Sequence, residues 1–350
     1  MVLLLNYIKL FLKSCLPFFL RYLQKGNQQL PITMNQGLTT LIPKPNKDLL
    51  LIDNWRPISL PDNDYKVFAL IIANRLKMVL DSIIDETQSG FIPKRHITNN
   101  IRLVLDILDY SDFITCDGFI LFLDFYKAFD TVEHDFIFQA LDKHGFGSYF
   151  STAIKTLYHN SNSSIKLTNG TSPRFNIQIG IRQGCPISPY LFLIAQLLSN
   201  HMKSSNVKGI SLIGKDLLIT QLEDDTTLFL KDEHQISIAI ETISIFSKAS
   251  GLYLNIPKCE LMAIKDCSKT TMCNIPIKQE VRYLGIIITK NQESRITQNF
   301  YPFQEKLKHR LNQWLLRDLS LKGRVLITKA EGISRLTYAS LALHLDEKNS

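Results

Sequence analysis

The sequence predicts an α+β fold, in which an antiparallel sheet and amphipathic helices share an apolar core. The unbroken apolar run Phe119–Leu123 is typical of a strand buried on both faces. The β-rich segments Leu217–Leu222 and Thr226–Leu230 flank a short acidic turn, which indicates a β-hairpin. Apolar residues at helical spacing predict a helix over about Tyr65–Ile84, with Asp64 as its N-cap.

Composition and charge limit the classes of function. The chain has 350 residues, 45% hydrophobic and 21% charged, which suits two or three subdomains and argues against extended disorder. The formal net charge of +8 favours a polyanionic partner, nucleic acid first and an anionic membrane surface second. The six cysteines form no CxxC pair and no zinc-ligand spacing, which indicates reduced thiols in an intracellular protein and no structural zinc.

Residues 1–34 predict an N-terminal helical extension. Val2–Leu20 is rich in Leu and Phe, but Lys9 and Lys13 interrupt it. No uncharged run therefore reaches the roughly twenty residues that a membrane span needs. We expect an amphipathic helix that covers the body of the protein, and no transmembrane segment. An anionic-membrane-binding protein is the most distant alternative, resting on residues 1–25 alone.

The region after this extension predicts a strand, a turn and a returning segment. The strand is expected at Leu38–Ile42 and is followed by a polar, proline-punctuated turn over residues 43–48. The chain then returns at Trp55–Leu60.

Two further helices are expected. The capping-box spacing from Asp130 to Glu133 predicts the start of one helix. The other should run from Gln304 to about Ala330 and should be basic, because residues 305–330 contain seven Lys or Arg and two acidic residues.

Three carboxylates stand at strand ends: Asp124 after the apolar run, and Asp224 with Asp225 at the hairpin tip. A single aspartate there is ordinarily a cap or an ion-pair partner. Two adjacent carboxylates, however, repel and raise each other's pKa, a cost that a divalent cation removes. Mg²⁺ prefers such hard oxygen ligands, and two ions about 4 Å apart can stabilise the attacking and leaving oxygens of a phosphoryl displacement.

Nine short motifs follow one another along roughly residues 30–340. Three correspond to polymerase motifs A, B and C: FLDFYKAFD at 122–130, RQGCPISP at 182–189 and the Asp224-Asp225 hairpin. The others are LIPK at 41–44, NWRPISL at 54–60, QSGF at 88–91, GLYLN at 251–255, Lys258, and YLG at 283–285. On these motifs the chain closely resembles the reverse transcriptases of LINE-like, non-LTR retrotransposons.

The resemblance implies a right-hand polymerase with an antiparallel-sheet palm, helix-rich fingers and a helical thumb. The fingers would span residues 35–110, the palm 111–290 with a fingers segment at about 131–167, and the thumb 291–350, with truncation after it. The implied reaction is RNA-directed DNA synthesis, in which a primer 3′-hydroxyl attacks the α-phosphate of a dNTP. The implied partners are an RNA template, a DNA primer and dNTPs, with no oligomeric state indicated.

The same resemblance assigns the metal and triphosphate sites. Asp124, Asp224 and Asp225 would hold two Mg²⁺ ions, for which Mn²⁺ could substitute. Lys44 and Arg56 would bind the triphosphate, since Arg offers a bidentate fork and Lys a point charge. For an isolated cation the ordinary interpretation is a solvated surface residue.

Further substrate roles follow from the resemblance. Phe129, five residues after Asp124, would select the sugar by excluding a ribose 2′-hydroxyl, unless it only packs in the core. Phe125, Gln183 and Gly184 would lie beside the incoming nucleotide, where Gly184 permits close backbone approach. Lys258 would act as general acid for the departing pyrophosphate, although a surface lysine is a ready alternative.

The basic thumb helix resembles the element that follows the backbone of an RNA–DNA duplex. A helix merely solvated on one face is the alternative. The expected contacts are Lys306, Lys308, Arg310, Trp314, Arg317 and Arg324.

The chain departs from the family at Leu222 and Glu223, where an aromatic residue and Ala usually precede the Asp pair. Gln196 stands where the family more often has Glu. No endonuclease precedes the polymerase region and no Cys/His knuckle follows it, so we expect a fragment of an element, as an impaired or decayed copy.

Two other classes of protein fit the same sequence. A catalytically silent nucleic-acid-binding remnant would keep the fold and its basic groove but extend no primer. An intron-maturase-like protein would add an RNA-binding domain past the thumb. Neither nucleus nor cytoplasm is indicated as its compartment.

Overall fold

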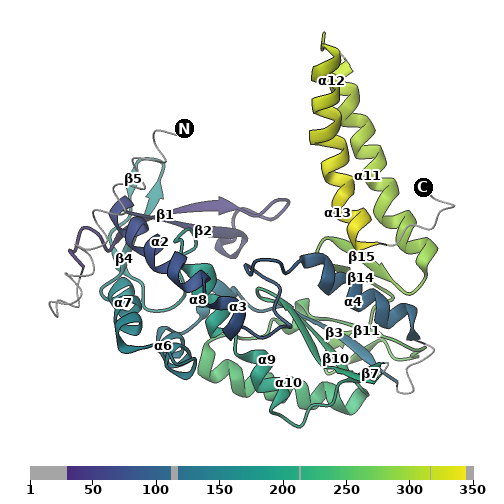
Figure 1. Cartoon of the computed structure of the whole chain (residues 1–350), viewed down its shortest axis with the longest axis horizontal. Coiled ribbons are helices and arrows are strands. Elements are labelled where there is room, and N and C mark those ends of the chain that lie inside the picture. Colours follow the sequence, from purple (N-terminus) through teal and green to yellow (C-terminus); the bar gives the residue numbers. More distant parts are fainter. Residues whose placement is uncertain (1–29, 112–116, 213, 316, 344–350) are drawn as a thin grey trace.

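The computed structural model describes residues 30–111, 117–212, 214–315 and 317–343, which form a mixed helix-and-sheet fold (Figure 1). Apart from residues 30–34, the helical extension expected over residues 1–34 lies outside this part of the chain. No helix among the described residues is long and apolar enough to cross a membrane.

A four-stranded antiparallel sheet lies at the centre of the palm. Its strand order is β11 (Glu260–Ala263), β3 (Phe119–Leu123), β10 (Asp225–Leu230) and β9 (Ile219–Leu222). All five residues of β3 are buried, because it has a neighbour on each side and packing on both faces. The predicted strand and the predicted hairpin are confirmed, except that Leu217 belongs to a separate short strand.

The two faces of this sheet pack into different cores, since successive side chains of a strand point to opposite sides. Leu121 and its alternate neighbours pack with α8 (Ser188–Ala195) and α10 (Glu233–Ser250). Ile120 and Phe122 pack with α4 (Ile97–Asp109) and the hairpin of β14 (Glu280–Tyr283) and β15 (Ile286–Thr289). This double coverage explains why the strand sequence is apolar throughout.

A second sheet, at the opposite side of the molecule from the thumb in Figure 1, carries the fingers strands. Here β1 (Gln36–Pro43) pairs antiparallel with β2 (Trp55–Pro61) and parallel with β4 (Asn162–Leu167). The expected strand and returning segment are thus both confirmed. The short strands β5 (Gly170–Thr171) and β6 (Phe175–Asn176) each pair with β4.

The helix expected at Tyr65–Ile84 is divided into α2 (Asn63–Lys77) and α3 (Leu80–Ile83). The amides of Met78 and Val79 bond to carbonyls three residues back, which tightens the last turn and ends α2. Asp64 as the N-cap is wrong. The N-cap is Asp62, which has non-helical backbone after Pro61 and whose carboxylate accepts from the amide of Asn63.

The helix expected to begin at Asp130 is also wrong. A short α5 (Ala128–Thr131) ends there, and α6 (His134–Lys143) begins after an extended Glu133. The amide of Glu133 donates to the carbonyl of Ser250, a contact distant in sequence that holds this residue extended. Tertiary pairing therefore overrides the local capping pattern.

The thumb consists of α11 (Gln292–Leu315), α12 (Leu321–Ile327), the π-helical turn Thr328–Ile333 and α13 (Ser334–Ala342), which stand away from the palm in Figure 1. The single basic helix expected over residues 304–330 is wrong, because the chain turns and Ser320 caps α12 by accepting from the amide of Gly323. At the thumb base, Arg295 donates to both carboxylate oxygens of Asp109 at 3.1 and 2.9 Å.

The remaining elements connect these parts. They are η1 (Ile52–Asn54), α7 (Ser148–Tyr158), α9 (Leu198–Lys203), β7 (Ile210–Leu212), β8 (Lys215–Leu217), η3 (Ile256–Lys258), β12 (Thr271–Met272), β13 (Ile275–Pro276), β14 (Glu280–Tyr283) and β15 (Ile286–Thr289).

Candidate active site

Two adjacent strands of the palm sheet place the three acidic residues at the same end of the sheet. This end, formed by Asp124, Asp224 and Asp225, is called the acidic edge below. Thr226 on β10 pairs with Leu123 on β3, so Asp225 and Asp124 are the next residues along the two strands. Asp225 also pairs with Leu222, which leaves Glu223 and Asp224 as the two-residue loop of the hairpin. The order of the strands therefore makes neighbours of residues a hundred positions apart in sequence.

The charges of these aspartates affect one another. The protein packed around Asp225 raises its pKa to about 6, and the negative charges of Asp224 and Asp124 add to that shift, although the side chain stays accessible. Burial followed by the charge of Asp124 raises the pKa of Asp224. Like charges at one strand edge are the condition that a bound cation would relieve.

Asp124 is held by two residues of the segment that precedes β11. The side-chain amide of Asn255 donates to Asp124 Oδ2 at 2.8 Å, and the backbone amide of Asn255 donates to the Asp124 carbonyl at 2.8 Å. Lys258 Nζ lies 3.7 Å from Asp124 Oδ2. The predicted general acid is thus an ion-pair partner of a predicted metal ligand.

The donor set suits a hard divalent cation, because it consists of carboxylate oxygens at an accessible edge. Among the described residues, however, no three His, Cys, Asp or Glu side chains are grouped closely enough to hold a metal by themselves. Mg²⁺ usually completes its shell with water and substrate phosphate oxygens. Convergence of the three carboxylates within a few ångströms stays a prediction.

Four cations gather near this edge. Burial lowers the pKa of Lys44, and the positive charges of Lys258, Arg56 and Lys127 lower it further. Lys44, directly after β1, also donates to the carbonyl of Asp53 at 2.9 Å. Lys44 and Arg56, the two fingers cations predicted to bind a triphosphate, therefore interact electrostatically with Lys258, which lies beside Asp124. Such a group of positive charges suits an anion-binding site.

Sequence reasoning missed Lys127 and its partner. Lys127 lies in motif A with left-handed backbone (φ 44°), and its Nζ is 2.6 Å from Asp53 Oδ1. The ion pair raises the pKa of Lys127 and lowers that of Asp53. It joins the turn between β1 and β2 to the palm. The position of Lys127, three residues after Asp124, was the available signal.

The predicted sugar-selecting residue is held by an aromatic stack. The ring of Phe129 is stacked on Phe192 of α8, with centroids 4.2 Å apart and planes at 18°. Phe129 remains partly exposed, whereas Phe125 is only 6% exposed and packs inside the main core. The burial of Phe125 leaves little of its ring for a substrate.

The motif B loop lies against the fingers strand β2. The backbone carbonyl of Gln183 accepts from the amide of Ser59 at 2.8 Å, and its side chain donates to Asp130 Oδ1 at 2.8 Å. Gly184 has φ 107°, and a Cβ there would lie 2.5 Å from the Ser59 carbonyl oxygen. Glycine is required at this close approach. Burial raises the pKa of the neighbouring Cys185 thiol, consistent with a packed side chain.

The thumb cations are exposed, as a surface that contacts a polyanion requires. Arg310 is ion-paired with Glu331 at 3.0 Å, and the Arg317 guanidinium lies 5.4 Å from the Trp314 ring centroid. The other predicted contacts of this surface are likewise exposed: Lys306, Lys308 and Arg324.

Comparison with known proteins decides the family. Residues 42–288 match the family described as reverse transcriptase (RNA-dependent DNA polymerase). The chain belongs to the reverse transcriptase family. The matched region contains all three acidic residues. It also contains the expected fingers segment, residues 35–110, apart from residues 35–41.

The relatives of this reverse transcriptase chain come from mobile elements, which confirms the non-LTR resemblance. It is 29% identical to the transposon TX1 uncharacterized 149 kDa protein of Xenopus laevis, over 97% of this chain and 27% of that protein. It is 27% identical to a Pol polyprotein from the R2 retrotransposable element of Popillia japonica, over 84% of this chain and 42% of that protein. The chain thus spans less than half the length of these relatives.

Solved structures confirm the right-hand polymerase fold. Apo telomerase from Candida tropicalis superposes with a TM-score of 0.53 at 11% identity, covering 74% of this chain and 48% of that one. The Candida tropicalis telomerase in complex with a fragment of telomeric RNA gives 0.52 at 12% identity, covering 90% of this chain and 55% of that one.

Proposed function

We propose that this chain is the polymerase core of a LINE-like retroelement and copies RNA into DNA. The carrying observation is the pairing of β3 with β10, which puts Asp124 and Asp225 at neighbouring strand ends, together with the charge interaction of Lys44 and Arg56 with Lys258, the ion-pair partner of Asp124. Carboxylates on one side and phosphate-binding cations on the other suit nucleotidyl transfer. The primer 3′-hydroxyl attacks the α-phosphate of a dNTP, and pyrophosphate leaves.

The proposed cofactor is a pair of Mg²⁺ ions held by Asp124, Asp224 and Asp225, with Mn²⁺ as a substitute. When bound, they would supply charge stabilisation at the attacking and leaving oxygens. Asn255 fixes the rotamer of Asp124 through its 2.8 Å hydrogen bond. This orients one carboxylate oxygen and leaves the other available to the cation.

The cations then orient the nucleotide. Lys44 and Arg56 bind the triphosphate, and Lys258 donates a proton to the departing pyrophosphate. Lys127 joins this group once its ion pair with Asp53 opens. Phe129, held by Phe192, blocks the space of a 2′-hydroxyl, so that dNTPs are preferred over rNTPs.

The proposed partners are an RNA template and a DNA primer. The exposed basic thumb surface offers backbone contacts without base readout. A solved telomerase of the same fold is in complex with an RNA fragment. We propose the same division along the chain as above: fingers at 35–110 with about 131–167, palm at 111–290, thumb from 291.

A silent nucleic-acid-binding remnant is the second candidate, and Glu223 favours it. Burial and the charges of Asp224 and Asp225 raise the pKa of Glu223 to about 7, so a fourth carboxyl group lies within the field of the acidic edge. At neutral pH it is partly ionised and would oppose an incoming triphosphate.

Homopolymer-templated extension decides between them. Purified chain with poly(rA), oligo(dT), dTTP and Mg²⁺ should incorporate dTMP, and Asp225→Asn should abolish this. Template–primer binding without incorporation, in Mg²⁺ and in Mn²⁺, would establish the remnant instead.

A further inference from the structure

A buried glutamine clamps the hairpin loop formed by Glu223 and Asp224, directly before Asp225. Gln88 is 2% exposed. Its Oε1 accepts from the backbone amide of Glu223 at 2.8 Å, and its Nε2 donates to the Glu223 carbonyl at 3.2 Å. One side-chain amide therefore satisfies both backbone groups of the first loop residue. Gln196 Nε2 donates to the same carbonyl at 3.1 Å.

The clamped loop residue needs external support. Glu223 has φ 57°, a left-handed conformation that costs free energy for a residue with a Cβ and that glycine adopts without penalty. Nothing in the side chain of Glu223 favours this conformation in the way an asparagine would. The hydrogen bonds from Gln88 therefore hold the loop, and with it the direction of Asp224 and Asp225.

The segment that carries Gln88 pairs with β9, the outer strand of the palm sheet, through one isolated β-bridge. The amide of Gln221 on β9 donates to the Thr87 carbonyl at 2.8 Å, and the amide of Ser89 donates back to the Gln221 carbonyl at 2.9 Å. Gln88 and Gln221 form a parallel bridge. The hairpin is thus supported on its outer edge by residues from the fingers part of the sequence.

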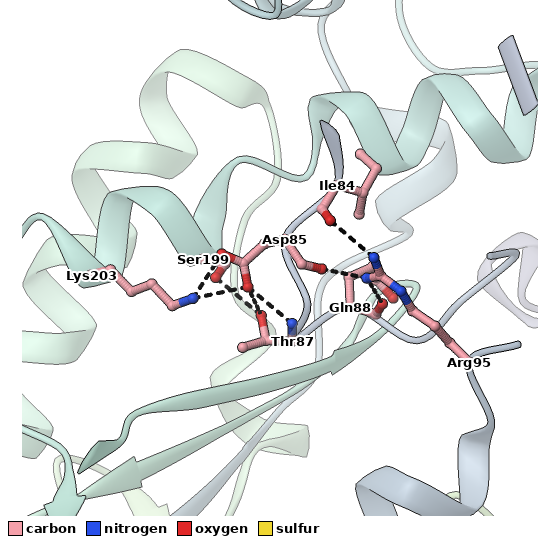
Figure 2. Close-up of polar contacts among 7 residues, drawn as sticks. All are labelled: Ile84, Asp85, Thr87, Gln88, Arg95, Ser199 and Lys203. Atoms are coloured by element: carbon pink, nitrogen blue, oxygen red, sulfur yellow. Dashed lines mark hydrogen bonds and ion pairs between the residues drawn. The ribbon is translucent and has the colours of Figure 1, made fainter. Parts of the chain in front are cut away.

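Figure 2 shows what holds this segment in place. Arg95 Nη1 donates to the carbonyls of Asp85 and Gln88 at 2.6 and 2.7 Å. The carboxylate of Asp85 accepts from Lys203 of α9 at 2.9 and 2.7 Å and from the Thr87 hydroxyl at 2.7 Å. Charged hydrogen bonds from Lys203 of α9 and from Arg95, in the loop before α4, thus hold residues 85–88, and Gln88 in turn holds Glu223.

A glycine marks how closely the segment approaches the loop. A Cβ on Gly90 would lie 2.7 Å from Glu223 Cγ and 2.8 Å from the Glu223 backbone nitrogen. Any larger residue at position 90 would push the loop outward. The motif QSGF, which the resemblance identified without a role, thereby acquires a physical one.

We propose that Gln88 is a positioning residue for the metal-binding carboxylates of Asp224 and Asp225, with Arg95 and Lys203 bracing its segment. The proposal rests on the proposed function for its catalytic consequence. Its structural consequence, a loop held by one buried amide, can be measured without catalysis.

The first experiment measures amide hydrogen exchange and Mn²⁺ binding in the full chain. Gln88→Ala should accelerate exchange at residues 222–225 at least tenfold and weaken Mn²⁺ binding several-fold. Gln235→Ala is the matched control, because this buried glutamine accepts from the amide of Lys208 in another loop. Unchanged exchange at residues 222–225 in Gln88→Ala would overturn the proposal even if the chain proves to be an inactive polymerase.

The kinetic experiment separates positioning from general destabilisation. Gln88→Ala should lower kcat at least tenfold and raise the half-saturating Mg²⁺ concentration, with KM for template–primer unchanged. In that background Glu223→Gly should recover at least threefold more activity than Glu223→Ala, whereas the two should match within twofold when Gln88 is present. Equal rescue in both backgrounds would contradict the proposal.

A steric variant covers the case in which Gln88→Ala does not fold. Gly90→Ala should accelerate exchange at residues 222–225, because its Cβ displaces Glu223. Gly147→Ala is the control, since a Cβ there meets nothing within 4 Å. Identical exchange in the two variants would refute the close support of the loop.

Discussion

The palm and the thumb hold their functional side chains in opposite ways. In the palm, Asp124 is fixed by Asn255, and the loop before Asp225 is clamped by a glutamine that is 2% exposed. In the thumb, α12 has no buried residue among those described, and the predicted duplex contacts on α11, Lys306, Lys308 and Arg310, are exposed. Preorganised groups suit chemistry, which fails with small displacements, whereas flexible cations suit a regular phosphate backbone. Palm substitutions should therefore cause large, discrete losses of rate, and thumb substitutions graded losses of affinity.

The largest effect is expected at the acidic edge. Asp225→Asn should reduce primer extension at least about 10³-fold, because removing a metal ligand takes away several kcal/mol of transition-state stabilisation. The measurement is single-turnover extension at saturating template–primer. A reduction below about tenfold would show that Asp225 is not a metal ligand. It would also contradict the expectation that palm substitutions cause large losses of rate.

Next is sugar selection. Phe129→Val should lower the preference for dNTP over rNTP by about ten- to a hundredfold while dNTP use persists, because removing the ring vacates space for a 2′-hydroxyl. Competing dTTP and UTP on one template gives the ratio directly. Phe192→Leu, which removes only the stacking partner, serves as the comparison variant. An unchanged ratio in Phe129→Val would assign Phe129 to core packing.

Glu223→Ala should raise polymerase activity at least tenfold. Burial raises the pKa of the Glu223 carboxyl group to about 7, and the charges of Asp224 and Asp225 add to this shift. At about 5 Å and an effective dielectric near 20, one charge pair contributes roughly 3 kcal/mol before metals screen it. Extension rates at pH 6.5 and 8 test this, and the gain should be larger at pH 8, where Glu223 is ionised. A native chain that is fully active and unaffected by the substitution would make Glu223 a tolerated variant.

The thumb prediction is smaller and electrostatic. Neutralising Lys306, Arg310 and Arg317 together should reduce the salt dependence of template–primer binding by up to about three units of slope, roughly one for each phosphate that these side chains no longer neutralise. Arg310 should contribute least, because Glu331 already pairs with it. Binding isotherms at several salt concentrations supply the slope. An unaltered slope would place the duplex elsewhere.

The smallest effect concerns stability without metal. Folding raises the pKa of Glu223 to about 7 and that of Asp225 to about 6, so the folded chain binds more protons than the unfolded chain between their ordinary values and these. Stability is therefore highest at low pH within this window and falls as pH rises towards 7. The Tm in a chelator should drop by a few degrees between pH 5 and 7.5, and less in Glu223→Gln. A Tm that rises across this range in the native chain would show that folding lowers these pKa values.

The central fold was predictable because its signals are local. The apolar run of β3 and the hairpin of β9 and β10 can each be recognised from a few adjacent residues. The acidic residues lie directly at the ends of these strands, so predicting the strands also locates them. The start of α6 was not predictable, since the amide of Glu133 is held extended by Ser250, a partner from a distant part of the sequence. The thumb break at Ser320 was missed because basic residues occur on both sides of it, at Arg317 and at Lys322 and Arg324.

The site divides in the same way. In the sequence, Asp124 and the Asp224-Asp225 pair are recognisable as charges next to apolar segments. Gln88 has no such local signal, because its role depends on contacts with the β9–β10 hairpin that form only in the folded chain. The ion pair of Lys127 with Asp53 was hidden for the same reason, because its partners meet only when the fingers turn folds over the palm. Composition reveals residues that break a local pattern, but not those whose partner comes from another element.

The central claim is that the edge formed by Asp124 and the Asp224-Asp225 hairpin binds the catalytic metals. Anomalous diffraction from crystals of the full chain with Mn²⁺, a dNTP and a template–primer ending in a 3′-deoxynucleotide tests it most directly. We expect Mn²⁺ within about 2.0–2.3 Å of oxygens of Asp124 and of at least one residue of the pair. Manganese bound elsewhere, with Asp124 still held only by Asn255 and Lys258, would contradict it.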